Sequence, residues 1–289
     1  MDERAALRAL AGQVPAAGDD AAVVDGHVLT TDMLHERTDF PAGTTRYTAG
    51  WRAVGASLSD VAAMGAEAVA AVAAYGAPSF AGVEAFVDGA QAVCERVDAT
   101  YVGGDLDAHE EFTVATTALG RTHEPVRRSG ARPGDVVCVT GTLGRSGVAC
   151  RLFEAGEAER ANELFRFEPR VAAGRALAPD ATAMMDSSDG LARSLHQLAD
   201  ASDCGFAVES PLPIDDAVHE VAADETERRE LGVFFGEDFE LVCTLPPDRV
   251  TAAREATPVA LSRIGAVTDG GLTLDGDPLP DWGYTHGES

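Results

Sequence analysis

The stretch Met184-Met185-Asp186-Ser187-Ser188-Asp189-Gly190-Leu191 predicts how this chain folds. Its apolar start predicts a short strand that ends at Asp186, and the hydroxyl residues and glycine that follow predict a turn. Leucines then recur at helical spacing at 191, 195 and 198, which predicts a helix. We expect Asp189 to cap the helix, which ends before Gly205. A first helical turn also suits an anion, to which Asp186 and Asp189 could bring a metal.

Outward from this unit, short Val- and Ala-rich runs alternate with amphipathic segments along the whole chain. Strands are expected at 21–24, 27–31, 69–74, 113–119, 135–139, 181–185 and 239–244, and helices at 49–64 and 83–97. This order predicts an α+β fold with mixed α/β layers. Gly and Pro gather in Arg127–Asp135, so we expect an N-terminal domain over residues 1–126 and a C-terminal domain over 127–289.

The composition is strongly acidic and contains no lysine. Asp and Glu number 48 against 22 basic residues, all arginine, which gives a formal net charge of -26. This balance resembles that of salt-adapted proteins, because at molar salt a Debye length of ~3 Å screens the repulsion. Nucleic acid and anionic membranes are therefore not expected as partners.

The remaining sequence statistics indicate a cytoplasmic protein without structural metal or disulfides. The acidic start Met1-Asp2-Glu3 does not resemble a signal peptide, and no window of the sequence is apolar enough to span a bilayer. The five cysteines are widely spaced and form no C-x-x-C pair, so neither a disulfide framework nor a zinc site is predicted.

Aspartates beside glycine or small hydroxyl residues recur along the chain. They lie in Gly18–Asp20, Thr30–Asp32, Ser59–Asp60, Gly103–Asp105, Asp186–Gly190 and Gly236–Asp238. One Gly-Asp pair alone is more typical of a solvated turn. Most of these motifs, however, follow short apolar runs or precede helices. Converging carboxylates repel one another unless hard cations lie between them, and magnesium accepts oxygen ligands together with phosphate. The set therefore predicts a metal-bound polyphosphate as the ligand.

The segment Gly141-Thr142-Leu143-Gly144-Arg145-Ser146-Gly147 follows an expected strand and opens a helix, as phosphate loops do. Its glycine spacing differs from the dinucleotide fingerprint, and a chain without lysine cannot contain a P-loop. We expect a tight turn here. Any ATP would then be held by metals and backbone groups.

Taken in order, the motifs resemble the thiamine-monophosphate kinase family, within the aminoimidazole-ribonucleotide synthetase superfamily. The matching segments are Gly18–Asp20, Thr30–Leu34, Leu58–Ala66, Val102–Asp105, Arg128–Asp135, Asp186–Leu191 and Gly236–Leu241. The resemblance implies a two-domain synthetase-like fold and a homodimer in which N-terminal sheets pair, with 69–74 and 113–119 as suitable strands. It also implies magnesium-dependent, in-line transfer of the γ-phosphate of ATP to thiamine monophosphate, which yields thiamine diphosphate.

The resemblance also assigns roles to matching positions. Contacts to several magnesium ions are implied for Asp20, Thr30, Thr31, Asp32, Asp60, Asp105, Asp186 and Asp189, of which Asp60, Asp105, Asp186 and Asp189 are central to catalysis. ATP contacts are implied for Gly104, Asp105, Arg128 and Ser188. Contacts to thiamine monophosphate are implied for Glu237 and for an aromatic residue of the tail, Tyr284 ahead of Trp282. Asp39 stands where many members have a substrate-contacting histidine.

Other interpretations fit less well. Selenophosphate synthetases carry an early cysteine or selenocysteine with a nearby lysine, whereas the first cysteine here is Cys94. Hydrogenase-maturation relatives end in cysteine, and this chain ends in Ser289. A non-catalytic nucleotide or cation binder with a decayed site is disfavoured because the principal aspartates are all present. An ATP-turnover assay separates that class from an enzyme.

Overall fold

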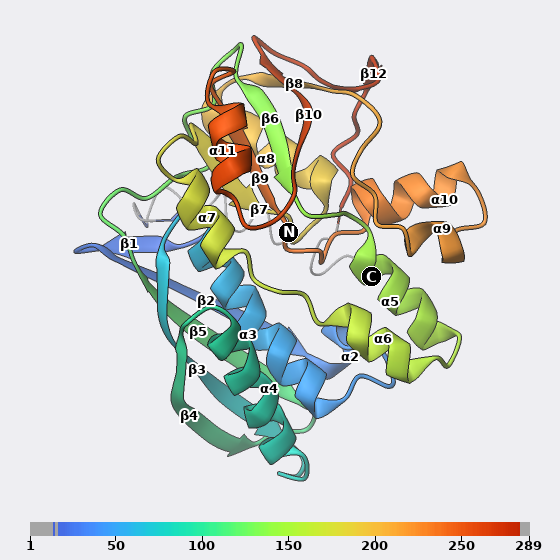
Figure 1. Ribbon diagram of the computed structural model, residues 1–289. Coiled ribbons are helices and arrows are strands. Elements are labelled where there is room, and N and C mark those ends of the chain that lie inside the picture. Colours follow the sequence, from blue (N-terminus) through green and yellow to red (C-terminus); the bar gives the residue numbers. More distant parts are fainter. Residues whose placement is uncertain (1–13, 15–16, 284–289) are drawn as a thin grey trace.

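The computed structural model describes Val14 and residues 17–283 of the chain. Two β-sheets follow one another along the sequence, and helices pack on both (Figure 1). Among the described residues, no helix is both long and apolar enough to cross a membrane.

The first sheet has five strands in the order β1-β2-β5-β3-β4. The strands are β1 (Ala22–Val24), β2 (His27–His35), β3 (Glu67–Ala77), β4 (Thr100–Ala108) and β5 (Thr113–Arg121). Neighbours are antiparallel except for β3 and β4, which are parallel and are therefore joined by a helical crossover. The helices of this part are α2 (Glu36–Asp39), α3 (Arg46–Ala63) and α4 (Val83–Arg96).

Helices α3 and α4 lie along one face of the first sheet and contact each other closely (Figure 1). Two glycines allow this approach. A Cβ atom on Gly50 would lie 2.0 Å from the carbonyl oxygen of Phe86, and one on Gly89 would lie 2.0 Å from that of Tyr47. An alanine at either position would force the helices apart, because real Cβ atoms do not approach backbone that closely.

The opposite face of the first sheet carries exposed apolar side chains. Alternate residues of β2 point away from the helices, and Leu29 and Met33 are 47% and 60% exposed. Val72 of β3 lies on the same face and is 36% exposed. This uncovered face is defined by Leu29, Met33 and Val72, and apolar patches of this kind commonly mark interaction surfaces.

The second sheet has seven strands in the order β12-β11-β8-β10-β6-β9-β7. They are β6 (Val136–Thr140), β7 (Ala183–Asp186), β8 (Gly205–Val208), β9 (Leu241–Leu245), β10 (Leu261–Thr268), β11 (Leu272–Leu274) and β12 (Asp277–Pro278). The helices are α5 (Arg145–Glu154), α6 (Ala158–Phe165), α7 (Val171–Leu177), α8 (Leu191–Ser202), α9 (Val218–Val221), α10 (Glu225–Arg229), the π-helix η1 (Glu230–Phe234) and α11 (Val250–Ala256). Strands β6 and β9 are buried along their whole length.

Helix α3 joins the two parts of the molecule. It contacts β2 and β5 of the first sheet as well as α7 and β7. The contact with α7 is close, since a Cβ atom on Gly174 would lie 2.1 Å from the carbonyl oxygen of Ala62. One apolar cluster accordingly runs from α3 and α4 to Met184 and Leu241 of the second sheet. The end of α3 is thereby fixed beside the end of β7.

The sequence predictions of secondary structure are largely confirmed. Every expected strand is present, as are the expected helices at 49–64 and 83–97, the one that follows Asp189 and the one that residues 141–147 open, with ends that differ by a few residues. Strands β4, β8, β10, β11 and β12 were not expected. The α+β class is confirmed. The domain boundary at residues 126 and 127 stays a prediction, although it falls between the two sheets.

Candidate metal and phosphate site

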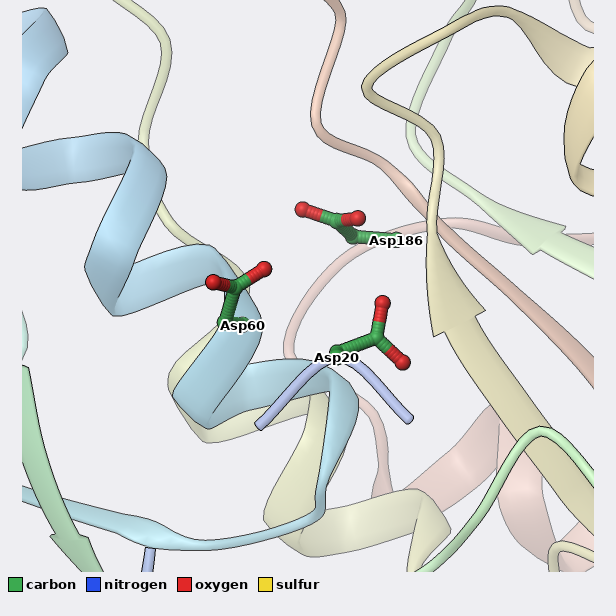
Figure 2. Close-up of side chains that lie close together, drawn as sticks. All are labelled: Asp20, Asp60 and Asp186. Carbon is green, nitrogen blue, oxygen red and sulfur yellow. The ribbon is translucent and has the colours of Figure 1, made fainter. Parts of the chain in front are cut away.

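Three aspartates from distant parts of the chain converge between the two sheets. Asp20 lies in the turn before β1, Asp60 in the last turn of α3 and Asp186 at the end of β7 (Figure 2). One carboxylate oxygen from each lies within 4.8 Å of the others. We call Asp20, Asp60 and Asp186 the aspartate cluster. The sequence predicted all three as metal contacts, and the structure brings them together.

Hydroxyl groups fix the orientation of these carboxylates. Thr30 Oγ1 donates a hydrogen bond of 2.5 Å to Asp60, and Ser59 Oγ donates one of 2.6 Å to Asp186. Because Ser59 and Asp60 are adjacent on α3, the same helical turn supplies one member of the cluster and orients another. These bonds hold the carboxylates in place but leave their charges uncompensated.

Burial makes the cluster electrostatically unfavourable as it stands. Burial, with repulsion from Asp32 and Asp186, raises the pKa of Asp60 well above its ordinary value. Burial and repulsion from Asp20 raise the pKa of Asp186 to about 8. Asp60 and Asp186 therefore resist ionisation in the folded protein unless a cation lies among the carboxylates. The arrangement is therefore one that a hard divalent cation would stabilise.

Arg128 supplies the positive side chain that contacts the cluster. Its Nη2 and Nε donate to the two carboxylate oxygens of Asp20 at 2.9 and 3.2 Å. Burial alone would lower the pKa of this guanidinium, but attraction to Asp20, Asp186 and Asp60 raises it overall. Arg128 was predicted to touch ATP. It stands next to the cluster with 23% of its side chain exposed.

The other predicted metal contacts fall on both faces of the first sheet. Asp32 faces α3, where Ser57 Oγ donates to it at 2.5 Å, and burial raises the pKa of its carboxyl. Thr31 and Asp105 lie on the opposite, uncovered face and are exposed.

The strand register pairs Met33 with Ala115, Ala115 with Ala74 and Ala74 with Asp105. Asp105 is thus three strands, or about 14 Å, from β2. Within one chain the structure does not bring Thr31 and Asp105 to the aspartate cluster.

Gly104 and Asp105 instead line a separate cavity of about 710 Å³ between β4 and α4. Its wall includes the ring of Tyr75, whose buried hydroxyl has no hydrogen-bond partner among the described residues. A Cβ atom on Gly104 would lie 1.8 Å from the carbonyl oxygen of Ala73. The glycine is therefore required for β4 to pair with β3.

The turn after β7 differs in one respect from the prediction. The residue that precedes α8 is Gly190, with φ +100, so the expectation that Asp189 is the N-cap is wrong. Gly236 packs against the backbone of this turn, since a Cβ atom on it would lie 2.5 Å from the carbonyl oxygen of Ser188. Ser188 is half-buried, and its carbonyl oxygen accepts from the Glu237 amide at 2.6 Å. The hydroxyl of Ser187 is buried and has no hydrogen-bond partner among the described residues.

The loop Gly236–Phe239 connects this turn to a second part of the site. Its residues Gly236, Glu237 and Phe239 have φ values of +84, +62 and +53, a conformation that L side chains rarely adopt. Glu237 is held there by Arg52, whose Nη2 donates to the Glu237 carboxylate at 2.5 Å. Phe239 is held by stacking on Phe167 with ring centroids 4.1 Å apart.

Arg52 is a site residue that the sequence analysis missed. Its side chain is only 2% exposed, and its guanidinium lies 3.6 Å from the centre of the Phe165 ring. A second nitrogen donates to the Phe165 carbonyl oxygen at 2.5 Å. An arginine in the middle of an apolar helix is the signal that could have identified it, because buried arginine requires partners.

Glu237 and Asp39 line one cavity of about 420 Å³. Its other lining residues are Thr38, Pro41, Cys150, Glu230, Gly283 and the aromatic residues Phe165, Phe234 and Phe235. We call it the acidic aromatic cavity. Two residues predicted to contact substrate are thus brought together. Trp282 packs on Phe234 with ring centroids 5.6 Å apart, whereas Tyr284 lies outside the described residues.

The glycine-rich segment at residues 141–147 forms the expected tight turn between β6 and α5. The carboxylate of Asp238 accepts from the amides of Gly144 and Ser146, at 2.6 and 3.0 Å, and so caps α5. Burial raises the pKa of Asp238 to about 7 despite these two bonds. The position where a P-loop would place phosphate is thus taken by a side chain of the protein.

Models of the AIR synthase related protein family match this chain in two segments. The N-terminal domain model matches residues 18–122, and the C-terminal domain model matches residues 132–276. The fold is therefore that of an AIR synthase related protein, built from two such domains.

Individual relatives narrow this class. A thiamine-monophosphate kinase of Halobacterium salinarum is 66% identical and covers 99% of this chain and 100% of its own length. One of Methanospirillum hungatei is 40% identical and covers 99% of each chain. A solved structure described as AaThiL complexed with AMPPCP and TMP has a TM-score of 0.89 at 28% identity and covers 99% of this chain and 97% of its own. The chain belongs to the thiamine-monophosphate kinase family, a family of phosphotransferases.

Proposed function

We propose that this enzyme transfers the γ-phosphate of ATP to thiamine monophosphate and releases thiamine diphosphate and ADP. The observation that carries the proposal is the aspartate cluster, which a backbone hydrogen bond connects to the wall of the acidic aromatic cavity. The Glu237 amide, at the wall of that cavity, bonds Ser188 two residues after Asp186. Membership of the family supports the proposal, as does the relative that holds AMPPCP, an ATP analogue, together with TMP.

We propose that the aspartate cluster holds magnesium. The donor set fits this ion, because three carboxylates offer hard oxygen ligands and the raised pKa values of Asp60 and Asp186 reflect a repulsion that a bound cation relieves. Asp20, Asp60 and Asp186 would be the ligands, with Thr30 and Asp32 in support. When bound, magnesium would neutralise phosphate charge and reduce repulsion between the two substrates.

The remaining chemistry requires positioning more than proton transfer. The accepting phosphate of thiamine monophosphate has a second pKa of about 6, so its oxygen is largely ionised at neutral pH and needs no strong base. Arg128 remains charged beside Asp20 and, together with Ser188, would contact a phosphate of ATP. Asp189 follows in the same turn as a further candidate ligand. Glu237 and Asp39, which line the acidic aromatic cavity, would face the thiamine end of the substrate.

We also propose that the enzyme has two domains, residues 1–126 and 127–289, and that it acts as a homodimer. The first domain would supply Asp20 and Asp60, and the second would supply Asp186. The uncovered face of the first sheet is the surface that we assign to subunit pairing. Since Thr31 and Asp105 lie on that face, a metal role for either requires that it complete the site of a second copy. Gly104, next to Asp105 on β4, would contact ATP in the same way.

One assay tests the proposed reaction. The protein is incubated at high salt with thiamine monophosphate, ATP and magnesium, and thiamine diphosphate and ADP are measured by chromatography. We expect equal amounts of the two products and none when magnesium is chelated. ADP formation without thiamine diphosphate would refute the substrate assignment. Absence of ATP turnover would favour the non-catalytic alternative.

A further inference from the structure

The acidic aromatic cavity combines two features that together select for positive charge. The rings of Phe165, Phe234 and Phe235 line it, and so do the carboxylates of Asp39, Glu230 and Glu237. Aromatic faces attract cations through their quadrupole, and carboxylates attract them directly. Cys150 adds an apolar wall, because burial raises the pKa of its thiol to about 11 and keeps it neutral.

The π-helix η1 places three of these groups in the cavity. The amide of Phe235 donates to the carbonyl oxygen of Glu230 at 3.0 Å, a bond that spans five residues. In such a wide turn, Glu230 falls on the same face as Phe234 and Phe235, so that a carboxylate and two rings face one space. Single π turns inside helices often mark functional sites. A regular α-helix would bring Glu230 near Phe234, four residues on, and the wider π turn adds Phe235 to the same face.

The three carboxylates differ in how far their charge is already compensated. Glu237 pairs with Arg52 at 2.5 Å. Asp39 accepts from the amide of His35 and the hydroxyl of Thr38, both at 2.7 Å, which orients it without neutralising its charge. Glu230 is exposed, and its carboxylate has no hydrogen bond or ion pair among the described residues. The nearby Arg151 is itself paired with Glu154 and Glu227.

We propose that Glu230 is a specificity-determining residue that selects a flat organic cation, which is the thiazolium ring of thiamine if the proposed function holds. Glu230 and Asp39 supply the negative charge, and Phe234 and Phe235 supply the faces against which the ring lies. The inference rests on the proposed function only for the identity of the ligand. The charge preference itself follows from the cavity.

The test compares two ligands that differ only in charge. Thiamine carries a cationic thiazolium ring, and its analogue with a thiophene ring in that position is neutral and has almost the same shape. Binding of each is measured by isothermal titration calorimetry at constant potassium chloride concentration. Neither ligand has a phosphate, so the aspartate cluster and magnesium do not contribute. Phosphorylation of thiamine monophosphate is assayed separately, which keeps failure of the proposed function distinct from failure of this inference.

We expect the unmodified enzyme to bind thiamine about tenfold more tightly than the neutral analogue, the equivalent of one carboxylate and one aromatic contact. Glu230→Gln should remove most of this preference while binding of the analogue is unchanged, and Glu230→Asp should restore part of it. Glu163→Gln removes an exposed charge on α6, outside the cavity, and should behave as the unmodified enzyme. Equal binding of both ligands, or equal loss of both in Glu230→Gln, would overturn the inference.

Discussion

Replacing Asp186 by Asn should stabilise the enzyme in the absence of metal while it abolishes turnover. Asn has the size of Asp, and its amide oxygen can still accept the bond from Ser59, but it never ionises. The substitution therefore isolates the charge of one member of the aspartate cluster from its shape. We expect the loss of activity to follow from the loss of a carboxylate ligand for the metal.

The magnitude follows from the pKa of Asp186, which is raised from 3.8 to about 8. Above pH 3.8 the unfolded chain ionises this group, whereas the folded protein keeps it protonated until about pH 8. Stability is thus fully present below about pH 4 and is lost as the pH rises toward 8. At pH 7 the loss is about 4 kcal/mol, since each of roughly three pH units contributes about 1.4 kcal/mol.

In the unmodified enzyme, neighbouring carboxylates and water that enters the site already relieve part of this loss. We therefore expect Asp186→Asn to melt about 5–10 °C higher in chelator at neutral pH. The gain should disappear near pH 4, and magnesium should stabilise the unmodified enzyme more than the variant. Differential scanning calorimetry measures both. Glu255→Gln, which removes one exposed charge from α11, controls for net charge and should change little. A variant that melts at or below the unmodified enzyme, or a difference independent of pH, would refute the reasoning.

Three further outcomes are expected. Because the formal charge of -26 is screened by salt, the melting temperature should rise from dilute buffer toward molar potassium chloride, and a flat or falling curve would contradict salt adaptation. Light scattering should give a dimer mass at micromolar concentration and a lower mass for Met33→Asp on the uncovered face; a monomer mass for the unmodified enzyme would remove the dimer proposal. Since the pKa of Cys150 is raised to about 11, iodoacetamide should label it slowly at neutral pH and faster as the pH rises, and thiamine monophosphate should protect it. If thiamine monophosphate does not slow the labelling of Cys150, the substrate binds elsewhere.

The parts of the fold that could be predicted from the sequence are those in which apolar periodicity is strong. β6 and β9 are uninterrupted apolar runs, and α4 repeats its apolar residues on one face. β4 escaped prediction because glycines and acids interrupt it and its residues are largely exposed at the sheet edge. β8 and β11 are too short to show a period, and each is defined by the strands beside it.

The aspartate motifs indicated a metal site, but they could not indicate which members meet. Asp32 and Asp105 belong to similar motifs, and only the register of β2, β5, β3 and β4 places them on opposite faces of one sheet. Arg52 and Glu230 carried no motif. Their relevance comes from tertiary packing, through the buried pair with Glu237 and through a π turn that no local pattern specifies. The role of Tyr284 as a substrate contact stays a prediction.

The left-handed residues of the Gly236–Phe239 loop constrain how this enzyme can be improved. Glycine at 237 or 239 would relieve on the order of 1 kcal/mol of backbone strain at each position. The same change would remove the carboxylate that Arg52 holds or the ring that stacks on Phe167. Loss of either contact costs more than the strain that glycine relieves, because Arg52 would be left as a buried unpaired charge and the buried ring of Phe239 would leave a cavity. A library randomised at both positions should therefore retain Glu and an aromatic residue, both under selection for heat resistance and under selection for growth without external thiamine.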